Sequence, residues 1–262
     1  MKNIRNKGKP VIFISHIVEE KEVAIAFKEL IENGFLRMVE VFVSSDEESI
    51  QMGQKWLDKI TNALKTCTVK VIICSSKSVY KPWINFEAGA GWIKDIPIIP
   101  ICHSGMEPSK LPVPINLLQA GVATEVSSLK LTFSVIAKVL GAEEPRVDFS
   151  EFINKIREFE KVYTFWDGVN KAFEEIRSIN PQIIEALKSR KNTPIQLTEH
   201  QINMFENIFR RLEGKNILRF KKIGGVTITG TGMYINCIIE ILLDFEKVVS
   251  DEHFIFYKDF KR

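Results

Sequence analysis

The chain has 262 residues, of which 45% are hydrophobic and 26% are charged, and its formal net charge at pH 7 is +3. This is the balance of an ordinary globular protein that is long enough to bury a sizeable core, as one large domain or two small ones. Basic and acidic residues are well mixed, and the short basic group at residues 2–9 reads as a solvated tail. We therefore expect no nucleic-acid interface, which needs a clustered basic face.

The four cysteines and four histidines exclude other classes of site. Cys67, Cys74, Cys102 and Cys237 form no CxxC pair, so we expect reduced, buried thiols in a cytoplasmic protein. The histidines are scattered, and we expect no metal site. No apolar run reaches 18 residues, and the run after the basic N-terminus is too short for a signal peptide. We expect no membrane span.

The first 141 residues alternate between predicted strands and helices. Apolar runs predict strands at 11–14, 39–43, 69–74, 96–102 and 122–123, and helical periodicity predicts helices at 19–33, 53–66, 82–94 and 127–140. The prolines of the fourth strand predict a place at or near a sheet edge. This alternation predicts right-handed βαβ units and a parallel sheet covered on both faces.

Small or polar residues follow three of these strands: Ser15-His16, residues 44–46 and Ser75-Ser76. In such sheets ligands bind at the carboxyl ends of the strands. We therefore expect the binding rim of the domain at this end of the sheet.

The helix predicted at 82–94 carries the most informative pattern of the chain. Pro82 suits its first turn, and Trp83 and Glu87, four residues apart, share one face near the positive end of the helix dipole. Gly89 and Gly91 follow, although each glycine weakens a helix by roughly 1 kcal/mol relative to alanine. We expect them to allow close approach of the sheet, another helix or a ligand.

The pattern changes after residue 141. We predict a linker at 142–148 and a second, mostly helical α+β domain at 149–262. Helices are predicted at 149–164, 166–178, 181–191, 198–212 and 233–249, a hairpin at 217–229 around Gly224-Gly225, and a terminal strand at 254–257. This domain is expected to be a sensor, an oligomerisation module or a regulatory cap.

Five pieces of the first domain belong together by order and spacing. They are Val11 to His16, the segment with Asp46, Gly53, Trp56 and Ile60, Val71 to Ser75, the pair Trp83 and Glu87, and Ile98 to Ile101. In these pieces, residues 1–141 resemble a bacterial TIR (Toll/interleukin-1 receptor) domain. The resemblance implies a flavodoxin-like α/β fold with a central parallel sheet. Residues 149–262 carry no such resemblance.

The resemblance also implies an activity. TIR domains with a glutamate at this position typically cleave NAD+, so NAD+ is expected as substrate, with no cofactor, and Glu87 as the catalytic residue. A carboxylate beside the ribose stabilises the oxocarbenium-like state through which the nicotinamide–ribose bond breaks. The loop at 44–53 is implied to gate the pocket and to join protomers. The residues expected to line the pocket are Ser15, His16, Ser45, Asp46 and Trp83.

Other interpretations stay open at this point. Trp83 is equally well explained as core packing and Asp46 as a simple cap, whereas a lone histidine such as His16 is more often structural than part of a pocket. The enzyme expected here is an NAD+ glycohydrolase or cyclase; the main alternative is a non-catalytic TIR adaptor acting through TIR–TIR assembly, and a weaker one is a nucleoside-transferring enzyme. The domain arrangement is similar to that of anti-phage defence proteins, including the TIR components of Thoeris systems. It implies an activating ligand or phage protein at residues 149–262.

Overall fold

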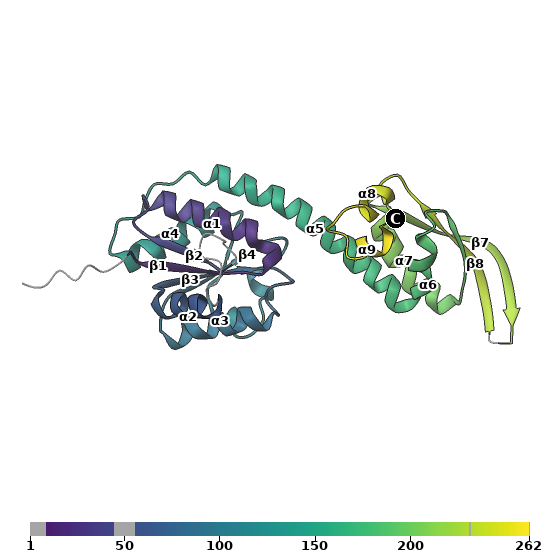
Figure 1. Ribbon diagram of the computed structural model, residues 1–262, viewed down its shortest axis with the longest axis horizontal. Coiled ribbons are helices and arrows are strands. Elements are labelled where there is room, and N and C mark those ends of the chain that lie inside the picture. The colour runs from purple at the N-terminus through teal and green to yellow at the C-terminus, as the bar shows by residue number, and fades with distance from the viewer. Residues whose placement is uncertain (1–8, 45–55, 231, 262) are drawn as a thin grey trace, which may run out of the picture. The chain divides into compact units, whose positions relative to one another are not determined.

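The computed structural model describes residues 9–44, 56–230 and 232–261 (Figure 1). The chain divides into two compact units, Met1–Lys161 and Val162–Arg262, each with its own hydrophobic core. The division lies inside one helix, α5 (Ser150–Ile179). The domain boundary and linker expected at 142–148 stay a prediction. Among the described residues, no helix combines the length and apolarity needed to cross a bilayer.

A five-stranded parallel sheet forms the centre of the first unit. Its strands are β1 (Val11–Ser15), β2 (Glu40–Val43), β3 (Val69–Cys74), β4 (Ile98–Cys102) and β5 (Gly121–Val122). The spatial order β2-β1-β3-β4-β5 is the flavodoxin-like order. The predicted α/β class is confirmed. Strand β4 adjoins the two-residue edge strand β5, in agreement with the position near an edge that its prolines predict.

Helices cover both faces of this sheet (Figure 1). The helices α1 (Lys21–Gly34), preceded by the 3-10 turn η1 (Val18–Glu20), and α4 (Val126–Leu140) lie on one face; α2 (Trp56–Thr66) and α3 (Pro82–Ile93) lie on the other. The proline-rich segment after β4 holds two 3-10 turns, η3 (Pro108–Lys110) and η4 (Ile115–Leu117).

The alternation of side chains along β1 decides which residues meet α3. Ile12 and Ile14 pack into the core under α1 and α4, whereas Phe13 packs with residues of α2. Because successive side chains of a strand point to opposite faces, Ser15 shares the face of Phe13. The last residue of β1 is thus presented to the α2 and α3 side of the sheet.

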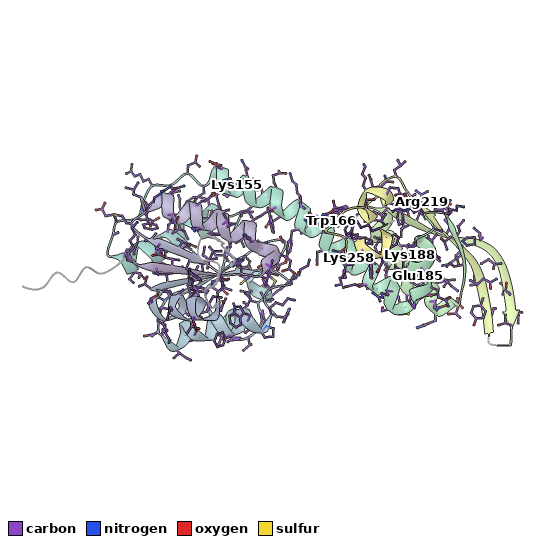
Figure 2. The ribbon with its side chains drawn as sticks, viewed as in Figure 1. Lys155, Trp166, Glu185, Lys188, Arg219 and Lys258 are labelled. Atoms are coloured by element: carbon purple, nitrogen blue, oxygen red, sulfur yellow. The ribbon has the colours of Figure 1, made fainter. Side chains whose placement is uncertain are left out.

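The second unit is built from helices and a three-stranded antiparallel sheet, as the predicted α+β class requires. Its sheet has the order β6-β8-β7, and its helices enclose a core that the end of α5 shares. Its further elements are α6 (Pro181–Leu187), β6 (Thr193–Leu197), α7 (Glu199–Glu213), β7 (Leu218–Thr229), β8 (Gly232–Ile241), α8 (Phe245–Val249) and α9 (Tyr257–Phe260). Glu185 of α6 and Lys188, which directly follows this helix, form a surface ion pair of 2.7 Å (Figure 2).

Several predictions for this unit are wrong. The two helices expected at 149–164 and 166–178 are the single helix α5. The hairpin expected around Gly224-Gly225 is one strand, β7, and the two glycines, with φ of 82° and 81°, form a bulge within it. The antiparallel partner of β7 is β8, in which Gly232 pairs with Thr229. Positive φ is common to bulges and turns, so the glycine pair alone does not separate them.

The C-terminal end also differs from expectation. The helix predicted at 233–249 is the strand β8 followed by the short helix α8. Cys237 and Ile239 of β8 are buried on one face, a period of two that the continuous apolar run conceals in the sequence. The terminal strand predicted at 254–257 is absent from the described residues, where a turn leads into α9.

Candidate functional site

Glu87 lies on α3, at the face that covers the sheet, and is fully buried. The hydroxyl of Ser15, at the carboxyl end of β1, donates a hydrogen bond to Oε2 of Glu87. Among the described residues, the other carboxylate oxygen, Oε1, is buried without a hydrogen-bond partner. A buried acceptor with no partner is costly, and such groups mark places where a ligand or water binds.

Burial changes the acid strength of this carboxyl. Removal from water raises the pKa of Glu87 from 4.5 to about 7. Three neighbours act against this shift and lower the pKa: the hydrogen bond from Ser15, the charge of Lys70 and, most weakly, the indole N–H of Trp83. Near neutral pH, the carboxyl is therefore poised between its neutral and its charged form.

Lys70 approaches the same residue from the sheet. It stands in β3, is fully buried, and donates from its ammonium to the backbone carbonyl of Glu87. The missing side chain of Gly91 explains how it reaches this position, because a Cβ there would lie 3.4 Å from the Lys70 stem and 3.1 Å from Ile98. The expected close approach is confirmed for Gly91. At Gly89 a Cβ would have no atom of the described residues within 4 Å, so packing within this part of the chain does not explain that glycine.

Trp83 lies one turn before Glu87 on the same helix. Its ring is half-buried, packs with the core beneath α2, and has its centroid 5.3 Å from that of Phe86. It therefore takes part in core packing, which is one of the two roles that the sequence left open, the other being a pocket wall. Its part in binding a ligand stays a prediction.

Of the three remaining predicted pocket residues, His16 alone lies in the part of the chain that the structure describes. His16 is buried at the end of β1, where burial lowers its pKa; the charges acting on it are those of Glu20 and Lys21, at the start of α1. Ser45 and Asp46 lie outside the residues that the structure describes. Their roles at the site stay predictions.

A second buried polar group lies at the carboxyl ends of β3 and β4, and the sequence did not reveal it. Oε1 of Glu20 accepts hydrogen bonds from Ser75 at 2.5 Å and from the ring of His103 at 3.1 Å. The backbone N–H of Ser104, next to His103, donates to Glu160 of α5 at 2.7 Å. His103 directly follows a strand, so the expectation that polar residues at the carboxyl ends of strands line a site, which selected Ser15 and His16, applies to His103 as well. No local sequence pattern marks Glu20.

All four cysteines are buried and free, as predicted, and burial raises the pKa of Cys102 to about 12. No group of three or more potential metal ligands occurs within the described residues. A cavity of about 430 Å³ lies at the opposite end of the sheet, against Trp92, Ile98 and Leu131. Its lining includes none of the predicted site residues.

Comparison with known families identifies the first unit. The sequence model of the TIR domain family matches residues 12–127, which span β1 to the start of α4 and include the whole parallel sheet. Residues 12–127 are a TIR domain. Ser15, Lys70 and Glu87 all lie inside it. A comparison with curated proteins finds no match.

Two solved structures are similar to the chain at low identity. One is that of the TIR domains of the activated Roq1 resistosome recognising the pathogen effector XopQ, with 15% identity, a TM-score of 0.32, and coverage of 59% of this chain and 83% of the other. The second is a metazoan TIR-STING receptor from C. gigas in complex with 2',3'-cGAMP, with 12% identity, a TM-score of 0.38, and coverage of 88% and 69%.

Proposed function

We propose that this TIR domain cleaves NAD+ between nicotinamide and ribose, as a glycohydrolase or cyclase, with Glu87 as the catalytic residue. The observation that carries the proposal is the buried carboxylate of Glu87: Ser15 fixes one oxygen, and the other has no hydrogen-bond partner among the residues that the structure describes. A scaffold that acts only by assembly has no use for a carboxyl kept out of water at this cost. A ribose hydroxyl is a donor of the kind that Oε1 lacks.

The chemistry asks little more of the protein than this carboxylate. The C1′–N1 bond breaks and its electron pair leaves with nicotinamide, which departs as a neutral molecule and needs no strong general acid. Positive charge then develops on the ribose, and the Glu87 carboxylate stabilises it. Water forms the new bond to C1′ and loses a proton, which gives ADP-ribose; attack by an atom of the ADP-ribose group itself gives a cyclic product.

Preorganisation supports the same assignment. Ser15 holds Glu87 from the end of β1 and Lys70 holds its backbone from β3, so the carboxylate is fixed before substrate binds. A group that is already oriented spends no free energy on reorganisation when charge develops in the transition state. We further propose that Trp83 and Ser15 border the nucleotide, together with His16, Ser45 and Asp46.

We extend the proposal to regulation and partners. A TIR domain followed by a second compact unit fits an enzyme whose basal activity is low and rises when residues 149–262 meet an activating ligand or a phage protein. We also propose that the chain self-associates through its TIR domain and acts in bacterial anti-phage defence. Light scattering of the purified chain, alone and with NAD+, tests the self-association.

The experiment that tests the activity follows nicotinamide release from NAD+ by the purified full chain. We expect release by wild type and by Glu107→Gln, which changes an exposed carboxylate paired with Lys110. We expect loss of release, by a factor of about 10² to 10³, in Glu87→Gln. Cleavage by Glu87→Gln at the wild-type rate would overturn the assignment. TIR–TIR assembly with no NAD+ cleavage under any condition would favour the adaptor.

A further inference from the structure

Among the lysines and arginines that the structure describes, Lys70 alone is buried over its whole surface, inside the parallel sheet. Lysine is almost never fully buried unless it is paired. Here the ammonium donates to the carbonyl of Glu87 and lies 5.3 Å from the ring centroid of Phe13, over its face. Its stem passes Gly91, the position on α3 where a side chain would meet it.

The charge partners of Lys70 are few. Among the described residues, the carboxylate of Glu87 favours the charged form of Lys70, and Lys94, after α3, opposes it. Cys67, which follows α2, would favour it only as a thiolate, and burial raises the pKa of that thiol. Desolvation lowers the pKa of Lys70. A buried ammonium in such surroundings is a cost to stability, and an apolar residue of equal size often fills such a place at no loss.

We propose that Lys70 is a positioning residue for Glu87: it fixes the backbone of α3 at the catalytic residue and supplies the positive charge that favours the carboxylate form. The inference rests on the proposed function of Glu87. Lys70 lies behind the helix on the sheet side and touches the backbone of Glu87, so it acts on the substrate through Glu87.

The groups that face Glu87 come from three elements. Ser15 of β1 donates to its carboxylate, Trp83 of α3 acts from the preceding turn, and Lys70 of β3 is the one charged side chain in the described part of the chain that shifts its acidity. Cys67 and Lys94 act on Lys70 and not on Glu87. Substitution of Lys70 therefore removes this charge and leaves the Glu87 carboxylate and its hydrogen bond from Ser15 in place.

Lys94, which directly follows α3, provides a matched control. Its ammonium also donates to backbone carbonyls, those of Leu64 at 3.2 Å and Cys67 at 2.7 Å, and so ties the end of α3 to α2. Loss of this lysine removes a similar anchor, but it does not change the surroundings of Glu87.

The test uses the full chain with Lys70→Met, Lys70→Gln and Lys94→Met, and it measures the midpoint of the Glu87 carboxyl titration by carbon NMR, assigned with Glu87→Gln. We expect both Lys70 variants to raise the midpoint by roughly one pH unit, and Lys94→Met to leave it unchanged. In the NAD+ assay we expect both Lys70 variants to lower kcat severalfold at pH 7, with KM little changed and with recovery at pH 9. Lys70→Gln, which keeps a donor for the carbonyl, loses less than Lys70→Met.

An unchanged midpoint in folded Lys70→Met and Lys70→Gln would overturn the proposal, as would an equal shift in Lys94→Met. Loss of folding in both Lys70 variants, seen by circular dichroism, would make Lys70 a structural residue and overturn it too. The titration midpoints of Glu87 test the role of Lys70 whether or not NAD+ is cleaved. A wild type without nicotinamide release would instead contradict the proposed function, so the two failures are distinguishable.

Discussion

Ser15 and Glu87 stand 72 residues apart in the chain, and the hydroxyl of the first donates a hydrogen bond to the carboxylate of the second. The bond joins the carboxyl end of the central strand β1 to the middle of α3. A small polar residue at a strand end and a glutamate on a helix become one site because the β-sheet order places β1 next to β3, under α3.

The activity of the site should rise with pH. Because the pKa of Glu87 is about 7, its charged fraction grows about tenfold between pH 6 and pH 8. We expect kcat/KM for NAD+ to rise by about the same factor. Ser15→Ala removes a hydrogen bond that lowers the pKa of Glu87, so the rise of kcat/KM in this variant should occur at higher pH. A profile that is flat from pH 6 to 8 in wild type would contradict this account of Glu87.

The same pKa makes Glu87 a cost to stability in neutral solution. The pKa of Glu87 is about 7 in the folded state against 4.5 for an ordinary glutamate. Its contribution to the free energy of unfolding is therefore fully present below pH 4.5 and is lost as the pH rises through 7. The loss amounts to about 3 kcal/mol. We expect Glu87→Gln to gain about this much over wild type between pH 4.5 and pH 8, measured by urea unfolding. A difference that does not vary with pH would contradict a buried, shifted carboxyl.

The two glycines of α3 should respond differently to alanine. A Cβ at Gly89 meets nothing, so Gly89→Ala should stabilise the helix by up to about 1 kcal/mol. A Cβ at Gly91 lies 3.1 Å from Ile98 and 3.4 Å from Lys70, and this crowding should cancel the gain. Thermal unfolding compares the two variants. Equal stabilisation by both would show that α3 does not lie as close to β3 as described.

Helix α7 of the second unit begins with a capping box at Thr198. Its hydroxyl accepts from the backbone N–H of Gln201 at 3.3 Å, and the Gln201 side chain accepts from the N–H of Thr198 at 3.2 Å. We expect Thr198→Ala to lower the free energy of unfolding by about 1 kcal/mol. Thr198→Ser keeps the cap and serves as control. Equal unfolding midpoints for the two variants would contradict the capping role.

The sequence predicted the TIR domain well because its signals are local. Buried parallel strands such as β3 are continuous apolar runs, and glycines such as Gly34 and Gly141 end the helices α1 and α4. The position of Glu87 near the strand ends also followed from the order of elements. Ser15 was expected beside it for the same reason, although no pattern gave the hydrogen bond itself.

The contacts that the sequence did not predict are long-range or ambiguous. In the sequence, Lys70 is a single polar residue within the apolar strand VKVIIC, and nothing nearby indicates its partner. The tertiary fold brings it to the backbone carbonyl of Glu87. Glu20 and His103, 83 residues apart, meet only through the sheet. In the second unit, the apolar run of β8 fits a helix as well as a strand, and its pairing with β6 and β7 decides between them.

The most direct test of the central claim, that Glu87 cleaves NAD+, is the cellular NAD+ level after induced expression of the full chain. Expression at high level favours the active form even when the trigger is unknown. We predict that NAD+ falls and nicotinamide rises with wild type and with Glu107→Gln, and that both stay at the uninduced level with Glu87→Gln at equal protein abundance. A fall in NAD+ with Glu87→Gln as large as that with wild type would contradict the account.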